Sequence, residues 1–442
     1  MTTVVYPPRN RTASPLWRNW SGSVVAAPAH LIRVTAEEDV VRAVQIAAQR
    51  GLGVRAAGTG HSFNRIVDTS GVLLDLSTFD GVLEVRPDEP SVTVHPGTLL
   101  RDVCSTVARH GLALPNIGTL AEQTVGGAIS TGNHGTGTRF APLAADVTAL
   151  RIVTADGQVR DLSVASTPEL LRHARTALGA LGVITAVTLR CVPAFTLRVS
   201  RRSLGFDEVV DDVESWACAA DHVALSWLPW QDRMAARLLW RETAVAVRPR
   251  RLRQYATTLS EIGCGLVGLA GTILPSAVPA LTGLLPGGPS GDYTDDSVRV
   301  FTFPQPVRFF PVEYAVDRTE LPAALSELRT ALRRHGWHTP YALLVRVGAG
   351  DDTSLSPAYG RDTAYLNVTV PRAQGYRPTL RLVERIMLGA GGRPHWAKLH
   401  SAAADTLAPR YPRWAAFQEA RTELDPDGMF LNDHLRRVLG AQ

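Results

Sequence analysis

Lysine is almost absent from this chain. Lys398 is the only lysine, and every other one of the 46 basic residues is arginine. The basic residues exceed the 41 acidic ones by five, but they are scattered along the chain. Scattered arginine is typical of a solvated surface, so we expect no nucleic-acid partner. The isolation of Lys398 marks it as a candidate for chemistry, because a compact ammonium can hold a negative charge at one point.

Cysteine is also scarce. The four cysteines lie far apart and form no CxxC pair, which argues against a zinc site or a disulfide framework. Few cysteines fit a reducing compartment, and the first residues lack the basic-then-apolar order of a signal peptide. We therefore predict a cytoplasmic protein. The prolines within residues 1–12 suggest a loose arm before Trp17.

Charge is missing from one long stretch. Residues 262–285 contain no charged side chain, and four arginines precede them, at 248, 250, 251 and 253. Length and basic flank suit a membrane span. Several glycines, Pro275 and Pro279 interrupt the run. Three interpretations stay open: a span, a surface-seeking element in contact with a membrane, or a buried or lid-forming helix pair.

Glycine is plentiful in two places. Residues 54–63 read VRAAGTGHSF, a short apolar strand broken by Gly58 and Gly60 before His61. The third glycine of a Rossmann fingerprint is missing. Residues 114–137 read LPNIGTLAEQTVGGAISTGNHGTG and contain no lysine, which excludes a P-loop. Such a run can wrap a pyrophosphate with backbone N–H groups, whereas a flexible linker would lack its Leu, Ile and Val residues.

The motifs, taken in order, resemble the aldonolactone oxidases and alditol oxidases of the vanillyl-alcohol-oxidase type of flavoprotein. They are Asn-Trp-Ser-Gly at 19–22, GTGHSF at 58–63, LPN at 114–116, TVGGAISTGNHGTG at 124–137, SLSPAYGRDT at 354–363, GGRPHWAKLH at 391–400 and LDPDGMFLN at 424–432. The resemblance covers nearly the whole chain. It implies FAD bound covalently at His61 through a methyl group of the flavin's benzenoid ring, with residues 117–137 around the pyrophosphate.

The resemblance also implies a set of cofactor-binding residues. They are Ala57, Gly58, Thr59, Gly60, His61, Ser62, Phe63, Gly118, Thr119, Thr124, Gly126, Gly127, Ser130, Thr131, Gly132, Asn133, His134, Gly135, Gly137, Gly182, Val183, Ile184, His400 and Asn432. The implied fold class is α+β. We expect a two-subdomain FAD-binding domain at 1–195, a substrate-binding cap with an antiparallel sheet and helices at 196–404, and a segment at 405–442 that returns to the first domain.

Local patterns predict several elements. Thr35 and Glu38 form a capping box that starts a helix ending at Gly51. Residues 147–154 and 159–162 flank Asp156-Gly157 and predict a hairpin. Helices are expected at 321–334, 380–388 and 411–424, and strands at 343–347 and 365–370.

Four residues are the candidates for catalysis. Lys398 and Arg346 match family residues that lie beside the flavin, and Thr119 and Thr369 match residues near the substrate. His395 and His400 do not share a helix face, so we predict no metal.

Three positions depart from the family. Leu344 replaces a glutamate, Asn367 a histidine and Pro311 a polar residue, which predicts a less polar pocket. We predict an FAD-dependent oxidoreductase that takes hydride from a CH–OH group of a sugar-lactone-like or polyol-like small molecule. Oxygen or another acceptor then takes the electrons, and Gly118 favours oxygen. Alternatives are a tailoring oxidase or cyclase acting on a less polar secondary-metabolite intermediate, a flavin-assisted isomerase, and a flavoprotein without turnover.

Overall fold

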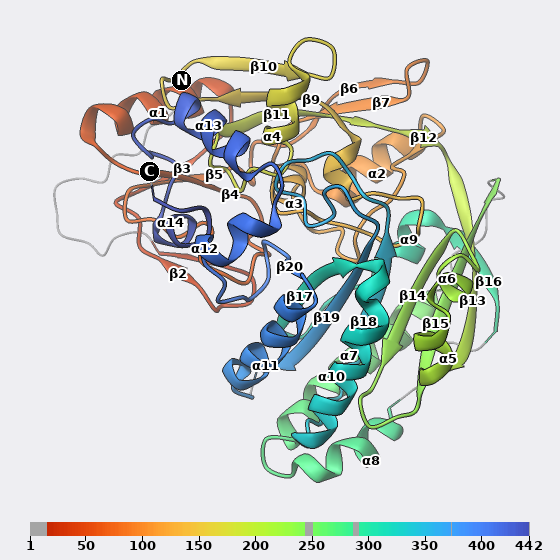
Figure 1. Ribbon diagram of the computed structural model, residues 1–442. Coiled ribbons are helices and arrows are strands. Elements are labelled where there is room, and N and C mark those ends of the chain that lie inside the picture. The colour runs from red at the N-terminus through yellow and green to blue at the C-terminus, as the bar shows by residue number, and fades with distance from the viewer. Residues whose placement is uncertain (1–15, 244–250, 286–290, 373, 442) are drawn as a thin grey trace.

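The structure is a computed structural model that describes residues 16–243, 251–285, 291–372 and 374–441 (Figure 1). The arm predicted at 1–12, Arg248 and Arg250 lie outside these residues. Two smaller sheets from the first part of the chain lie above one large sheet from the middle part in the view of Figure 1.

The first small sheet is parallel and carries the first glycine turn. Its strand order is β3 (His30–Arg33), β5 (Val72–Asp75) and β4 (Val54–Ala57), with α1 (Glu37–Arg50) packed against it. Helix α1 ends at Gly51, as predicted, with φ of 62°. The residue at its N-cap is Ala36, one position after the predicted cap at Thr35. The reason is that the Asp39 carboxylate accepts the N–H of Ala36 at 3.2 Å.

The second small sheet is antiparallel. Its order is β10 (Val159–Ser163), β9 (Val147–Val153), β11 (Val183–Arg190), β7 (Ser91–Val94) and β6 (Val82–Arg86). The β9–β10 hairpin is confirmed. The sheet is contacted by α1 and by three further helices, α2 (Leu100–Ala108), α3 (Val125–Ser130) and α4 (Pro168–Ala174).

The large sheet has eight strands, and every pairing in it is antiparallel. Their order is β16 (Tyr293–Asp296), β13 (Phe195–Gly205), β15 (Arg233–Thr243), β14 (His222–Trp227), β18 (Leu343–Gly348), β19 (Thr363–Pro371), β17 (Phe309–Asp317) and β20 (Arg393–Pro394). Four helices cover one face: α5 (Phe206–Asp211), α6 (Val213–Ala217), α10 (Leu321–Arg334) and α11 (Tyr376–Gly389). The expected antiparallel sheet with helices on one face is confirmed.

Alternation along the strands gives the large sheet a second, polar face. Val312, Tyr314 and Val316 of β17 pack with the helices, so Glu313 points to the opposite side. By the same alternation along the strand, the side chain of Arg346 in β18 points to the side of the sheet opposite the helices. The polar face therefore carries two of the four candidate catalytic residues, Arg346 of β18 and Thr369 of β19.

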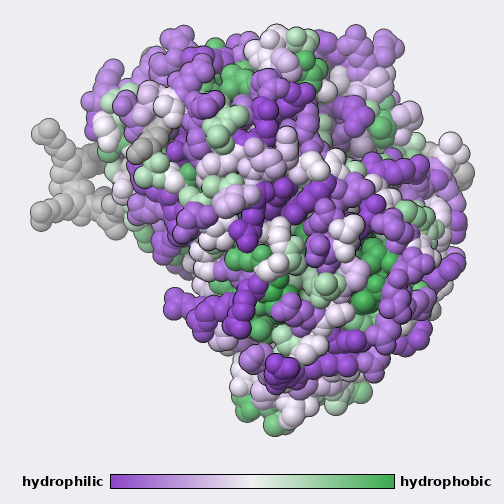
Figure 2. All heavy atoms as spheres, in the orientation of Figure 1, coloured by the Kyte–Doolittle hydropathy of each residue, from purple (hydrophilic) through white to green (hydrophobic). Residues whose placement is uncertain are grey.

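The uncharged stretch forms a helix pair, α7 (Arg251–Ala270) and α8 (Val278–Gly283), at the lower end of the molecule in Figure 1. Several of its apolar side chains are exposed, with Ile273 88% exposed, Leu284 81% and Leu266 65%, whereas Val267 and Val278 are buried. Figure 2 shows hydrophobic residues at this end of the surface. The interpretation as a buried pair is thus wrong for the exposed side chains. Among the described residues, no helix has the length and apolar character needed to cross a membrane.

The last segment packs against the first part of the chain. It contains α12 (Ala404–Leu407), α13 (Trp414–Leu424) and α14 (Asp433–Leu439). Phe417 of α13 shares a buried cluster with Leu171 of α4. The helix predicted from residue 411 begins three residues later, because the backbone of Tyr411 is extended.

Candidate functional site

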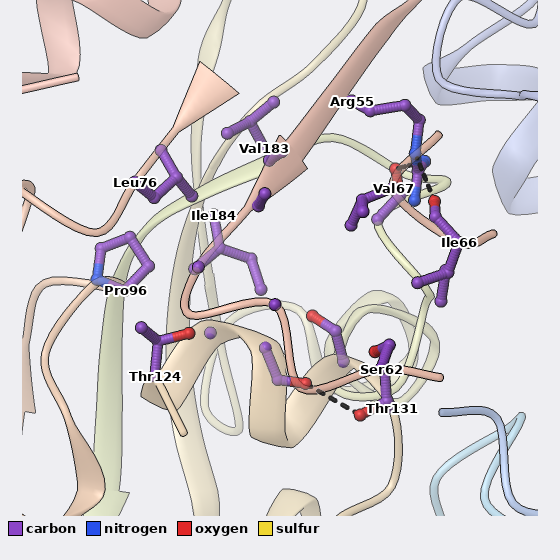
Figure 3. A pocket seen from close by; sticks show the side chains of 18 of the residues that line it. Arg55, Ser62, Ile66, Val67, Leu76, Pro96, Thr124, Thr131, Val183 and Ile184 are labelled. Carbon is purple, nitrogen blue, oxygen red and sulfur yellow. Dashed lines mark hydrogen bonds between the residues drawn. The ribbon is translucent and has the colours of Figure 1, made fainter. Parts of the chain in front are cut away.

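A first cavity lies between the two small sheets, with an empty volume of about 950 Å³ that includes space open to solvent. That is within the size range of cofactor sites. Most of its wall comes from three segments, 54–67, 123–131 and 178–184, and Trp17, Leu76, Pro96 and Phe430 complete it; part of the wall is drawn in Figure 3.

The glycine turn lines this cavity with unpaired backbone donors. The N–H groups of residues 58–62 donate no hydrogen bond within the described chain, and all five residues face the cavity. Gly60 has φ of 70°, and a side-chain carbon on Gly58 would lie 2.0 Å from the Thr124 hydroxyl. A row of free N–H groups against a closely packed wall suits the phosphates of a dinucleotide. These residues fit FAD.

Arg55 joins the walls of the first cavity. Its guanidinium donates to four backbone carbonyls, those of Ile66 at 2.9 Å, Leu178 at 2.7 Å, Gly179 at 3.2 Å and Phe430 at 2.6 Å. Figure 3 shows Arg55 reaching the loop that carries Ile66. All four partners line the cavity. Burial lowers the pKa of Arg55 to about 10, so it stays charged at neutral pH.

His61 stands where the first cavity meets a second one. Both cavities are lined by His61 and Gln123. The ring of Trp20 lies 5.4 Å from that of His61. Burial, and then the charge of Lys398, lower the pKa of His61 to about 4. The imidazole is therefore neutral at physiological pH.

The second cavity has an empty volume of about 520 Å³, including open solvent, and mostly polar walls. It is lined by His61, Phe63, Gly118, Thr119, Leu120, Gln123, Asn133, His134, Gln305, Glu313, Arg346, His395, Ala397 and Lys398. These residues come from both glycine stretches, from the polar face of the large sheet, from the segment before β17 and from the segment after β20.

Glu313 is the buried centre of the second cavity. His134 Nε2 donates to one carboxylate oxygen at 2.8 Å, and Asn367 Nδ2 donates to the other at 2.8 Å. The Lys398 ammonium lies 3.9 Å from that second oxygen. Burial opposes ionisation, but the hydrogen bond and charge of His134, with the charges of His395 and Lys398, hold the pKa of Glu313 well below its usual range. Glu313 is a carboxylate.

Two cations face the same cavity. Burial lowers the pKa of Lys398, Glu313 opposes that shift, and Arg346 adds to it. Burial also lowers the pKa of Arg346, against the attraction of Glu313. The Lys398 ammonium lies 5.1 Å from the centre of the Phe63 ring. A lysine and an arginine beside one carboxylate can stabilise an arriving negative charge.

His134, Glu313 and His395 form a cluster whose ligand atoms lie within 4.8 Å of one another. Such a group could hold a metal ion. Here the ammonium of Lys398 lies next to the shared carboxylate and already supplies positive charge.

Comparisons with known proteins agree with this geometry. Residues 187–438 match the family model of D-arabinono-1,4-lactone oxidase, and residues 28–163 match that of an FAD binding domain. The chain belongs to the aldonolactone oxidase family. L-gulono-1,4-lactone dehydrogenase of Mycobacterium tuberculosis is 38% identical over 97% of this chain and 100% of its own. L-gulonolactone oxidase of Bos taurus is 31% identical over 96% and 98%, and an alditol oxidase of Streptomyces is 32% identical over 95% and 98%.

Solved structures of cholesterol oxidase share the fold of this aldonolactone oxidase family member. One from Brevibacterium sterolicum has a TM-score of 0.77 at 15% identity, covering 99% of this chain and 100% of its own. The predicted family and α+β fold class, with a two-subdomain FAD-binding region and a cap, are confirmed.

The structure places most predicted cofactor residues on the two cavities. The first is lined by Ala57, Gly58, Thr59, Gly60, His61, Ser62, Thr124, Gly126, Gly127, Ser130, Thr131, Gly182, Val183 and Ile184, and the second by His61, Phe63, Gly118, Thr119, Asn133 and His134. Five others, Gly132, Gly135, Gly137, His400 and Asn432, line neither. Asn432 instead donates to the carbonyls of residues 65, 66 and 68, beside the first cavity.

Of the four catalytic candidates, Lys398, Arg346 and Thr119 line the second cavity. Thr369 does not, because its hydroxyl donates to Asn367 at 3.1 Å. Pro311 and Leu344 also lie outside the lining. The expected less polar pocket therefore differs from what the structure shows: Glu313 and Gln305 bring polar groups to the wall.

The sequence reasoning missed several lining residues. The sequence does contain a signal for Glu313, because it is a single acidic residue within the apolar strand sequence PVEYAV. The sequence contains no such signal for Gln305 or Arg55, because the residues that they contact in space are distant in sequence.

Proposed function

We propose that this protein is an FAD-dependent oxidoreductase that oxidises a CH–OH group of a sugar lactone or related polyol. The observation that carries the proposal is the meeting of two cavities at His61, one lined by free N–H groups and the other by Lys398 and Arg346. FAD, when bound, supplies the hydride acceptor.

The chain's own residues have distinct tasks in this proposal. The turn at 58–62 binds the cofactor's phosphates, and residues 182–184 support it. Lys398 and Arg346 orient the reacting oxygen and hold the negative charge that arrives with the hydride. The Thr119 hydroxyl positions the substrate. Residues 1–195 hold the cofactor, 196–404 close over it, and 405–442 complete the first part. Four free cysteines support the cytoplasm as the place of the reaction.

We further propose a covalent bond between His61 and FAD. The neutral imidazole has a free electron pair for bonding to carbon, and its position at the meeting of the cavities supports the attachment. Wild-type protein should keep its yellow fluorescence on a denaturing gel after acid treatment, and His61→Ala should release FAD. Complete release from wild type by acid precipitation would contradict the covalent bond but leave FAD binding intact.

Oxygen is the electron acceptor that Gly118 favours. A side-chain carbon on Gly118 would lie 2.7 Å from Asn133 Nδ2, so the small residue also allows Asn133 to pack. We expect the reduced flavin to reoxidise in air within seconds, as followed by stopped-flow absorbance. Gly118→Ala should slow that reoxidation. Reduced wild-type flavin that persists in air but reacts with an artificial acceptor would indicate a dehydrogenase.

A second candidate substrate is a less polar secondary-metabolite intermediate. The apolar residues Leu344 and Pro311 support it only as neighbours of Arg346 and Glu313 on the polar face of the large sheet, since neither lines the second cavity.

The deciding experiment is anaerobic bleaching of the flavin. We expect an aldonolactone such as L-gulono-1,4-lactone to bleach the flavin absorbance, and a redox-inert sugar ether to leave it unchanged. Bleaching only by apolar secondary alcohols would support the second candidate. No bleaching by any CH–OH compound would overturn the proposed oxidation.

A further inference from the structure

The loop between α9 (Ser297–Phe301) and β17 brings one residue, Gln305, to the wall of the second cavity. The Gln305 amide makes no hydrogen bond within the described chain. Among the described residues on this wall, Asn133 is already paired through both its amide atoms, with Gly118 N–H and with Gln123. Gln305 therefore offers a neutral amide whose oxygen and nitrogen are both free for a ligand.

The loop holds Gln305 in place before any ligand arrives. Pro304 and Pro306 flank it, and each fixes its own backbone φ. At the start of the loop, the Phe303 N–H donates to the Thr119 carbonyl at 3.1 Å. Near its end, Val307 packs against α7, where a side-chain carbon on Gly265 would meet it at 3.0 Å. A loop backbone that is already fixed loses little conformational entropy when Gln305 binds a ligand.

The other free groups on the wall have different chemistry. Lys398 and Arg346 can only donate hydrogen bonds. Glu313 can only accept, and its oxygens already bind His134 and Asn367. A hydroxyl group both donates and accepts, as an amide does. The His61 imidazole, the Thr119 hydroxyl and the Gln123 amide on this wall can also do both. The Gln123 oxygen already accepts from Asn133, and His61 is the proposed site of FAD attachment, so Gln305 is the lining amide among the described residues that leaves both its atoms to a substrate hydroxyl.

We propose that Gln305 determines specificity by binding a substrate hydroxyl other than the one that is oxidised. This inference rests on the proposed function and extends it. Gln305 selects a hydroxyl-rich lactone or polyol over a less polar alcohol, because a substrate without that hydroxyl leaves the amide unpaired. Leu344 and Pro311 are apolar and cannot select a substrate by its hydroxyl groups. That selectivity comes instead from a loop outside the large sheet.

The test compares a full substrate with its deoxy derivatives in the wild-type protein and three variants. The substrates are a hydroxyl-rich aldonolactone and deoxy derivatives that each lack one remote hydroxyl. The variants are Gln305→Met, which keeps length without polarity, and Gln305→Glu, which keeps an acceptor oxygen. Gln49→Met, on the exposed side of α1, is the control. Flavin content and melting temperature show that each variant folds.

We expect Gln305→Met to lower kcat/KM for the full lactone by roughly 10- to 100-fold and to change it less than about threefold for one deoxy lactone. Gln305→Glu should retain part of the discrimination, and Gln49→Met all of it. An equal fall for every substrate, or no change, would overturn the role of Gln305. Wild-type flavin that no lactone bleaches would overturn the proposed function instead. The affinity of an unreactive lactone, read from the flavin absorbance shift, would then still decide whether Gln305 binds a hydroxyl.

Discussion

Lys398 is the residue on which the proposed chemistry of the second cavity depends most directly. It lies between the Glu313 carboxylate and the Phe63 ring, and burial lowers the pKa of its ammonium. Arginine could not replace it simply, because a guanidinium is a planar fork rather than a point charge. The use of lysine at this one position, in a chain that otherwise uses arginine, fits that difference.

Removing the positive charge of Lys398 should therefore slow flavin reduction more than it destabilises the fold. We expect Lys398→Met to slow anaerobic flavin reduction by about 100-fold or more, because a charge aimed at the developing negative charge is lost. Stopped-flow absorbance at saturating substrate measures this rate. Arg381→Met, on the exposed side of α11, is the control. A rate that Lys398→Met leaves unchanged would make the lysine purely structural.

Arg55 joins the walls of the first cavity, so we expect it to affect cofactor binding through them. We expect Arg55→Met to lower the free energy of unfolding by about 2 to 4 kcal/mol, since buried carbonyls lose their donor. The FAD content of the purified protein should fall as well. Thermal unfolding and the flavin-to-protein absorbance ratio measure both effects. Arg50→Met, at the exposed end of α1, should change neither, and a fully loaded Arg55→Met protein would contradict the role.

At the scale of elements, the loop between β18 and β19 connects the large sheet to α4. Arg172 and Arg175 of this region both pair with Asp352, at 2.8 and 2.9 Å. The neighbouring Asp351 accepts hydrogen bonds from the Ser356 hydroxyl and the Thr353 N–H. Burial nevertheless raises the pKa of Asp351 to about 6, and Asp352 adds to that shift.

This raised pKa predicts a loss of stability as the pH rises. The folded protein holds the Asp351 proton more tightly than the unfolded chain, so the contribution is complete below about pH 4 and disappears between about pH 4 and 6. Asp351→Asn mimics the protonated form. We expect it to melt higher than wild type at pH 7.5, with a difference that shrinks toward pH 4.5. A difference that is constant with pH would show that Asp351 does not titrate in this range.

Many elements could be predicted from local pattern, and the site only in part. The hairpin at Asp156-Gly157 and the helix 321–334 follow from short-range signals, and the structure has both. The predicted N-cap of α1 is one residue too early. Two neighbouring acidic side chains could accept a backbone N–H at the start of this helix, and Asp39 is the one that does. The glycine turn revealed the cofactor site. The carboxylate at Glu313 could not be assigned to the cavity, because strand pairing across β17, β19 and β18 places it there.

At the scale of the whole molecule, the helix pair α7–α8 presents apolar side chains at the end far from the first cavity (Figures 1 and 2). Apolar groups gathered on one surface bind other apolar surfaces. We expect Ile273→Ser combined with Leu284→Ser to shorten retention on a phenyl column and to reduce detergent binding. Flavin reduction should not change. Gln49→Ser is the control, and unaltered retention would show that these side chains are covered in solution.

The joining of distant segments by Arg55 has a consequence for biosynthesis. One wall of the first cavity is Phe430, whose carbonyl binds Arg55 across 375 positions of sequence. A ribosome makes the glycine turn long before Phe430, so a nascent chain holds an unfinished cavity until Phe430 has been added. FAD can find a complete binding site only after that point. A shortage of flavin should therefore leave chains that extend past Phe430 without cofactor, rather than arrest them at the glycine turn.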